Sequence, residues 1–266
     1  MAGDDMLNDI EIIEEPNDNL KEDYVRDVFF VAINCGKLLL ESGAETYRIE
    51  DTMMRISNTY GISNPQVFVT PTVIIFSMNE HSLTQTVRIE DRANDLGMVN
   101  VINNLSRDIA RGMPIKSAIK KIEKIHDASV FPFWLMVLCG GMTAFMFLLL
   151  FSGSIADLPA ATFGGALGVF IMESILRFTR VKFFTEFFAS FFIAVTSFFY
   201  VQYGPGLNMD LIIIAAVMPL VPGVLITNAI REMIRGHLLA GVMKGTEAML
   251  TAFAIGAGVA LIFMLI

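Results

Sequence analysis

The second half of the chain consists of long apolar runs separated by short polar connections. Five of these runs reach the roughly 20 residues that a helix needs to cross a hydrocarbon core about 30 Å thick. They predict transmembrane helices at Pro132–Phe151, Ala156–Leu176, Phe184–Tyr203, Leu211–Ile230 and Ala248–Ile266. One such run alone could be a core helix of a soluble protein, but five in succession indicate a polytopic α-helical membrane domain.

Basic residues occur in the segment before the first predicted span and then in every second connection. They lie before the first span, after the second and after the fourth, at Lys116, Lys120, Lys121, Lys124, Arg177, Arg180, Lys182, Arg231, Arg235 and Lys244. The two remaining connections, Phe151–Asp157 and Tyr203–Asp210, contain neither Lys nor Arg. Because cytoplasmic connections carry an excess of Lys and Arg, we expect the N-terminus in the cytoplasm and the C-terminus outside.

The first half of the chain has the shorter patterns of an α+β domain. Helical and alternating spacings predict helices at 19–60, 94–111 and 114–126, and strands at 67–77 and 83–89. The first helix should be interrupted at Ser42-Gly43, where Ser42 and Glu45 predict a capping box that starts a second segment. Gly61 is a natural stop for that segment. Pro71 implies that the first strand lies at a sheet edge or contains a bulge.

The composition supports the membrane assignment, with 54% hydrophobic and 17% charged residues and a mean hydropathy of +0.60. Soluble domains contain about 25% charged residues. The net charge of −8 arises mainly in residues 1–19, which hold seven acids and no Lys or Arg. We therefore expect an acidic disordered leader at 1–19, a cytoplasmic α+β domain at 20–127 and a transmembrane domain with five spans at 128–266. The leader lacks the pattern of a signal peptide, and the chain lacks a basic surface for nucleic acid.

The fourth predicted span contains the most informative stretch, Met218–His237. Two prolines and a glycine interrupt its apolar run (Pro219, Pro222 and Gly223), and each proline removes a backbone donor and so frees carbonyl groups at membrane depth. At 100° per residue, the polar side chains that follow fall within an arc of about 100°. These are Asn228, Arg231, Glu232 and Arg235, with Thr227 beside them.

This polar arc predicts a substrate site for a small anion or zwitterion. Two guanidiniums can grip a carboxylate bidentately, and Glu232 can neutralise the empty site or relay a proton. The alternative is a proline-kinked span whose basic end anchors it at the cytoplasmic interface.

Other residues are candidates for coupling or gating. The break at Pro219, Pro222 and Gly223 can act as a hinge, and His237 follows the arc directly. Glu247 stands at the mouth of the fifth predicted span, where it could pair with an arginine. Glu173 is the deepest acid in a span and a candidate proton carrier. For Glu173 the alternative is an ordinary ion pair with Arg177, four residues on.

The residue pattern indicates no enzyme, cofactor or metal site. Cys35 and Cys139 form no spacing motif, and His81 and His126 have no partner at the spacing of metal ligands or a catalytic triad. The charged residues between 45 and 55 fit an exposed helix face with weak ion pairs. We therefore expect no catalytic residues, no metal and no cofactor.

Two segments resemble the threonine/serine exporter family, and within it the short YjjP-like subunits. They are ESGAETYRIEDTMMRI (Glu41–Ile56), which the expected strand pair follows, and MPLVPGVLITNAIREMIRGHLLAGVMKGTEAML (Met218–Leu250). The resemblance implies an inner-membrane secondary exporter of small amino acids or of dicarboxylates such as succinate, driven by the proton gradient. The family's polar signature falls on Thr227, Asn228, Arg231, Glu232, Gly236, His237 and Glu247. Glu232 stands where the family pattern has Asp, which leaves the substrate open.

The resemblance also implies a partner. An odd number of spans suggests half of a larger transporter, because many transporters consist of paired repeats. The short family members work with a second small membrane subunit of the YjjB-like kind, and a homo-oligomer is a further option. The alternative function is a membrane-anchored ligand sensor or scaffold subunit, whose soluble domain carries the binding site and whose spans only anchor it.

Overall fold

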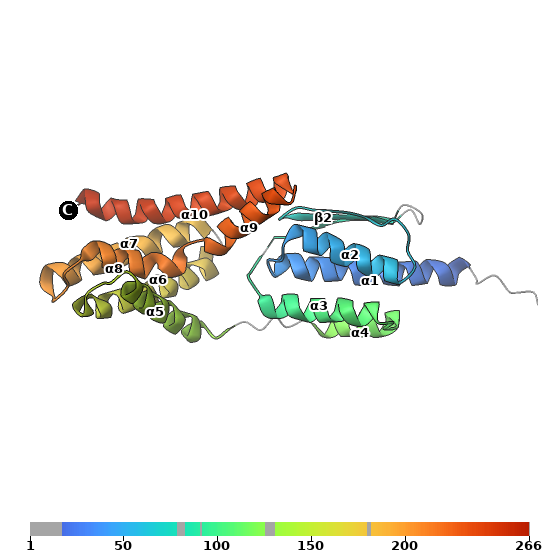
Figure 1. The fold of residues 1–266 in the computed structure, drawn as a ribbon, viewed down its shortest axis with the longest axis horizontal. Coiled ribbons are helices and arrows are strands. Elements are labelled where there is room, and N and C mark those ends of the chain that lie inside the picture. The colour runs from blue at the N-terminus through green and yellow to red at the C-terminus, as the bar shows by residue number, and fades with distance from the viewer. Residues whose placement is uncertain (1–17, 79–82, 91, 126–130, 180–181, 266) are drawn as a thin grey trace, which may run out of the picture. The chain divides into compact units, whose positions relative to one another are not determined.

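The computed structural model describes residues 18–78, 83–90, 92–125, 131–179 and 182–265 and divides into two compact units, Met1–Ala128 and Ser129–Ile266 (Figure 1). Each unit is considered by itself. Most of the expected acidic leader, together with His81 and His126, lies outside the described residues.

The N-terminal unit contains four helices and a small sheet (Figure 1). The helices are α1 (Asp18–Glu41), α2 (Thr46–Thr59), α3 (Leu96–Ala110) and α4 (Ile115–Lys124), and the strands are β1 (Gln66–Val69), β2 (Val73–Met78) and β3 (Leu83–Arg88). The strands form an antiparallel meander in the order β1-β2-β3. The α1–α2 pair packs against the sheet on one side and against α3 and α4 on the other. Its central position explains why its apolar residues dominate the buried core.

The single strand expected at 67–77 is wrong, because the segment forms a hairpin. β1 and β2 pair with Val69 opposite Ile74, and the chain turns between them. Thr70 closes the turn, since its N–H donates to the Val73 oxygen at 2.8 Å and its hydroxyl accepts from the Val73 N–H at 3.1 Å. Pro71 lies inside the turn, where its missing donor and fixed φ are tolerated.

The capping box expected at Ser42 and Glu45 is also wrong. The Ser42 hydroxyl donates to the Leu38 oxygen at 2.7 Å and therefore belongs to the end of α1. Gly43 has a φ of +77°, and the Ala44 N–H donates to the Leu39 oxygen at 3.0 Å. This is a Schellman ending, which a glycine outside the helix favours. The interruption at Ser42-Gly43 and the stop at Gly61 are confirmed.

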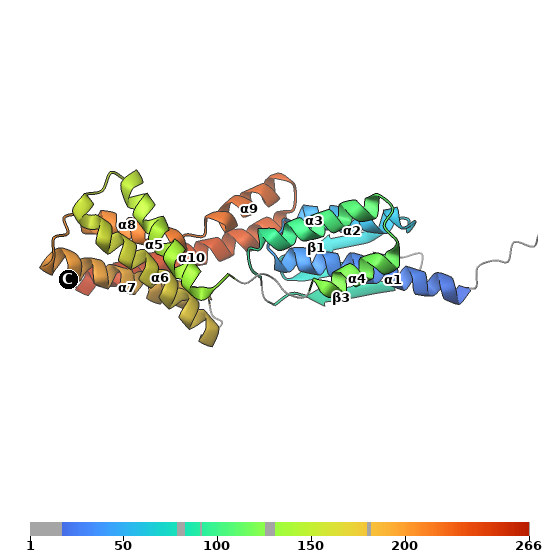
Figure 2. The ribbon, with the colours of Figure 1, turned by 90° about the horizontal axis from the view of Figure 1, so that it is seen from below.

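The second unit is a bundle of long apolar helices (Figure 2). Among the residues that the structure describes, four helices have the length and hydropathy of membrane spans: α5 (Phe133–Leu150), α6 (Leu158–Thr179), α7 (Lys182–Tyr203) and α10 (Leu238–Leu265). A bent pair can form a fifth span and consists of α8 (Met209–Val217), a 3-10 turn at Met218–Leu220 and α9 (Gly223–Ile234). The chain is therefore mostly helical, as expected of a polytopic membrane protein.

Glycines allow these helices to approach closely, as in other membrane bundles. A Cβ added at Gly165 of α6 would lie 2.5 Å from the Ala144 Cβ and 2.8 Å from the Gly140 oxygen of α5. A Cβ added at Gly258 of α10 would collide with the Ser190 hydroxyl and the Phe187 oxygen of α7. These contacts fix the α5–α6 and α7–α10 packing.

The predicted start of the last span, Ala248, lies ten residues after the start of α10 in the structure. α10 starts at Leu238 and has 28 residues, so it is about 42 Å long. Lys244 and Glu247 therefore lie within the helix, and Lys244 is not a charge of the connection, which consists only of the turn around Gly236 and His237.

The contact of Gly258 with Ser190 sets the level of α10 against α7, and the two helices run in the same direction (Figure 1). Gly258 is about 30 Å from the start of α10, whereas Ser190 is only about 12 Å from the start of α7. At 1.5 Å per residue, the hairpin of α9 and α10 should therefore extend about 18 Å beyond the start of α7. Both views of the ribbon show the hairpin extending past the other helices of the bundle (Figures 1 and 2).

Candidate functional site

The break in the fourth span lies at Val221-Pro222. The helix tightens into a 3-10 turn at Met218–Leu220, in which Pro219 occupies a first-turn position that requires no donor. Pro222 then precedes α9, and the axes on the two sides differ by 59°. A Cβ added at Gly223 would meet nothing within 4 Å, so no close packing requires the glycine there. The break therefore arises from the backbone at the two prolines and not from close packing at Gly223.

The other end of α9 is a second Schellman ending. Gly236 has a φ of +89°, and the His237 N–H donates to the Glu232 oxygen at 3.0 Å. The helix does not continue past Gly236, and α10 begins directly after His237. His237 is thus half-buried in the turn between the two helices.

A buried ion pair joins the two helices of the hairpin. The Lys244 Nζ of α10 lies 2.8 Å from the Glu232 Oε1 of α9, and their side chains are 6% and 0% exposed. Lys244 is about 21 Å before Gly258 along α10, which places the pair about 9 Å beyond the start of α7. The pair therefore links α9 to α10 across the turn at Gly236 and His237.

Small residues bring the helices close enough for this pair. A Cβ added at Gly241 would lie 3.0 Å from the Ala229 oxygen, and one added at Gly245 would lie 3.8 Å from the Ala229 Cβ. Gly241 and Gly245 are one turn apart, which is the small-residue spacing that lets helix backbones approach. Ala229 and Glu232 accordingly are the buried residues of α9.

The structure divides the predicted polar arc. Glu232 is buried and contacts Lys244, whereas Arg231 and Arg235 are exposed and Asn228 is half-buried. The Thr227 hydroxyl donates to the carbonyl oxygens of Gly223 and Val224, at 3.1 and 3.0 Å, and so is engaged by its own helix. The two arginines, the amide and Glu232 remain within about two turns at the end of α9, and Lys244 reaches Glu232 from α10.

Sequence reasoning missed Lys244 because it treated this residue as a connection charge. The sequence nevertheless contains a signal that places Lys244 within the next helix. Gly236 ends a helix in the same way as Gly43 and Gly61, and Lys244 lies within an apolar run that resumes at Leu238. Small or polar residues then recur on one face, at Gly241, Lys244, Ala248 and Thr251, and all four are buried.

Comparisons with known proteins cover most of the chain. The model of the ThrE family, described as a threonine/serine exporter family, matches residues 31–266. The chain belongs to the threonine/serine exporter family. Two relatives are named "Probable succinate transporter subunit YjjP", from Klebsiella aerogenes and Escherichia coli strain K12. They are 23% and 25% identical to this exporter-family chain over 239 residues, covering 88% of it and 92% and 93% of the relatives. No solved structure matches the chain significantly.

Of the remaining predicted residues, Glu173 lies in another helix than the pair, whereas Glu247 is one turn from Lys244. Glu173 is half-buried in α6, and no ion pair joins it to Arg177 among the described side chains. Arg177 instead lies over the Phe133 ring, 4.8 Å from its centroid. Glu247 is half-buried in α10, three residues after Lys244.

Within the described residues, no group of three or more His, Cys, Asp or Glu is placed to hold a metal ion. Both cysteines are free, and burial raises the pKa of the Cys35 thiol to about 12. Cys35 is therefore an unreactive core residue of the N-terminal unit.

Proposed function

We propose that the chain is a subunit of a secondary-active exporter of small carboxylate-bearing metabolites. The cargo class is threonine/serine-type amino acids or dicarboxylates such as succinate, and the proton gradient drives export. The observation that carries this proposal is a broken span followed at once by two arginines and a buried ion pair. The family membership and the names of the relatives support it.

The substrate carboxylate is bound by Arg231 and Arg235, with Asn228 and Thr227 beside them. Arginine suits this role because its planar fork matches a carboxylate bidentately. Both side chains are exposed, as a site that receives cargo requires. Glu232 does not contact the cargo in this proposal, because its carboxylate is buried against Lys244 of α10.

Proton coupling takes place at the Glu232–Lys244 pair. Protonation of Glu232 removes the charge that holds Lys244, and a buried lysine without a partner is costly. The hairpin then rearranges about the break at Pro219, Pro222 and Gly223. His237, Glu247 and Glu173 are the remaining titratable groups of the proposed proton path.

The exporter lies in the inner membrane with its N-terminal unit in the cytoplasm. The alternation of basic connections supports this topology, although Lys244 no longer counts toward it. The relatives are named as subunits. If the bent pair counts as one span, the chain has five spans, and many transporters combine such a set with a second, related set. A second small membrane subunit of the YjjB-like kind completes the path, either alone or with further copies of this chain.

The proposal is tested by replacing Arg231 with Ala and measuring metabolite efflux from cells. Arg177→Ala is the matched control, because Arg177 is also an exposed basic residue at the end of a span. Efflux should be lost in Arg231→Ala and retained in Arg177→Ala, with both proteins inserted at equal levels. Normal efflux from Arg231→Ala overturns the assignment.

A sensor or scaffold subunit is the second candidate. A basic hollow in the N-terminal unit, lined by Arg48, Arg55 and Arg107 among others, favours it. In that case the substitutions in α9 leave efflux unchanged. Substitutions in the hollow then alter the response of cells to the metabolite.

A further inference from the structure

A polar hollow lies between α2 and α3 of the N-terminal unit, and the proposed export path uses none of its residues. Its volume is about 200 Å³, and its lining consists of Arg48, Asp51, Thr52, Arg55, Asn103 and Arg107. This is room for a small polyatomic ion and too little for a macromolecular ligand.

Helix geometry explains why these side chains converge. Arg48 and Arg55 are seven residues apart on α2, so they lie on one face of that helix. Asn103 and Arg107 are four residues apart on α3 and likewise share a face. Since α2 and α3 pack together, the two faces meet along the same groove.

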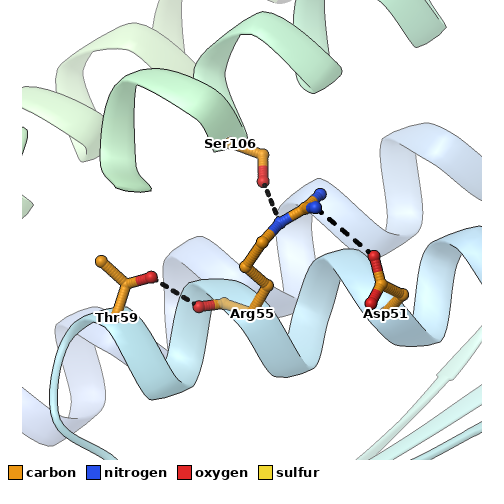
Figure 3. Close-up of polar contacts among 4 residues, drawn as sticks. All are labelled: Asp51, Arg55, Thr59 and Ser106. Carbon is orange, nitrogen blue, oxygen red and sulfur yellow. Dashed lines mark hydrogen bonds and ion pairs between the residues drawn. The ribbon is translucent and has the colours of Figure 1, made fainter. Parts of the chain in front are cut away.

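Neighbouring side chains hold the guanidinium of Arg55 in position (Figure 3). Its Nε donates to the Ser106 hydroxyl at 3.3 Å, and its Nη1 lies 3.5 Å from the Asp51 Oδ2. Ser106 is buried, so this anchor is rigid. Arginine has five N–H donors, and these two contacts leave the others for a ligand. A guanidinium that is already oriented loses less entropy when it binds an anion.

The charges of the hollow do not balance. Three guanidiniums face one carboxylate, and Asp51 is itself 67% exposed. Among the described residues, the side chains of Arg48 and Arg107 make no hydrogen bond or ion pair. The excess of two positive charges is the complement of a dianion, and Asn103 and Thr52 add neutral donors beside it.

We propose that this hollow is a binding site for a small dianion, held by Arg48, Arg55 and Arg107. The chemistry it recognises is two negative charges on closely spaced oxygen atoms, which a phosphate group and a short dicarboxylate share. The site shares no residue with the proposed export path, and its occupancy does not depend on whether the membrane unit transports the same compound.

The test measures binding of inorganic phosphate and of succinate, each alone, to the purified full-length chain by calorimetry. Arg107→Ala should weaken binding of at least one dianion by about tenfold or more, since a charge-assisted contact is lost. Arg111→Ala is the matched control: it removes the same charge from the next turn, outside the hollow, and should change the affinity less than about twofold. Neither side chain is buried, so both variants should fold, and the melting temperature of each variant is measured to check this.

Binding should also weaken as ionic strength rises, because exposed charges are screened. Preference for phosphate or for succinate identifies the source of the dianion. Two results overturn the proposal. One is the absence of saturable binding of both ions by the unaltered chain. The other is an equal loss in Arg107→Ala and Arg111→Ala, which indicates attraction by overall charge only. Either result leaves the export assignment intact, because that assignment rests on efflux and on residues of α9.

Discussion

The buried pair between Glu232 and Lys244 gives the sharpest energetic prediction. The two charged atoms are 2.8 Å apart, and the side chains are 0% and 6% exposed, so solvent cannot screen whichever charge remains after one is removed. Glu232→Gln leaves the buried Lys244 without its carboxylate and should therefore reduce the free energy of unfolding by about 3–5 kcal/mol. Lys244→Met should reduce it by less, because the remaining Glu232 carboxylate keeps a further contact. The double variant should lie within about 1 kcal/mol of the unaltered chain, because both charges have then left the interior.

A double-mutant cycle measures this coupling directly. The free energy of unfolding is measured by denaturant titration of the four purified proteins in the same detergent. Glu123→Gln and Lys124→Met on α4 are matched controls, because both side chains are exposed, and each should change stability by less than about 0.5 kcal/mol. Additive effects in the double variant, or single effects no larger than those of the controls, refute the reasoning.

Three further substitutions test the packing and the break. Gly258→Ala pushes a methyl group into the Ser190 hydroxyl of α7 and should cost about 1–3 kcal/mol in thermal unfolding, whereas Gly256→Ala, with nothing within 4 Å, should be close to neutral. Gly223→Ala places a methyl group in open space and should preserve stability. Slower efflux without loss of stability then shows that the break moves during transport. Unchanged efflux contradicts a hinge at this position. Asp157 is fully buried, and its Oδ1 accepts a hydrogen bond from the Leu207 N–H at 2.7 Å. Asp157→Ala should therefore reduce the free energy of unfolding by about 1–3 kcal/mol, and Asp157→Asn should reduce it distinctly less. Equal losses of stability in the two variants argue against a structural role for this bond.

The sequence was sufficient to predict the long apolar helices, because in a bilayer length and hydrophobicity alone determine them. It also predicted the broken span, since Pro222 cannot continue a helix. Local turn chemistry was less certain. A run of β-branched residues through Pro71 could be one bulged strand or two strands, and only tertiary pairing decides between them.

The candidate site could be predicted only in part, because it depends on contacts across a turn. Helical spacing placed Asn228, Arg231, Glu232 and Arg235 together, but it could not show that Glu232 faces another helix. Its partner Lys244 is 12 residues away, and the two meet only because Gly236 reverses the chain. The basic hollow of the N-terminal unit likewise requires α3, whose residues are about 50 positions from those of α2.

Efflux of labelled succinate and threonine from cells is the most direct test of the proposed export function. Cells that lack an exporter of this family are preloaded, and release is followed with the chain expressed alone and beside candidate small membrane subunits. The account predicts chain-dependent release of at least one compound, which Arg231→Ala abolishes, Arg177→Ala retains and a protonophore stops. Equal release of both compounds with and without the chain, in every subunit combination, contradicts it.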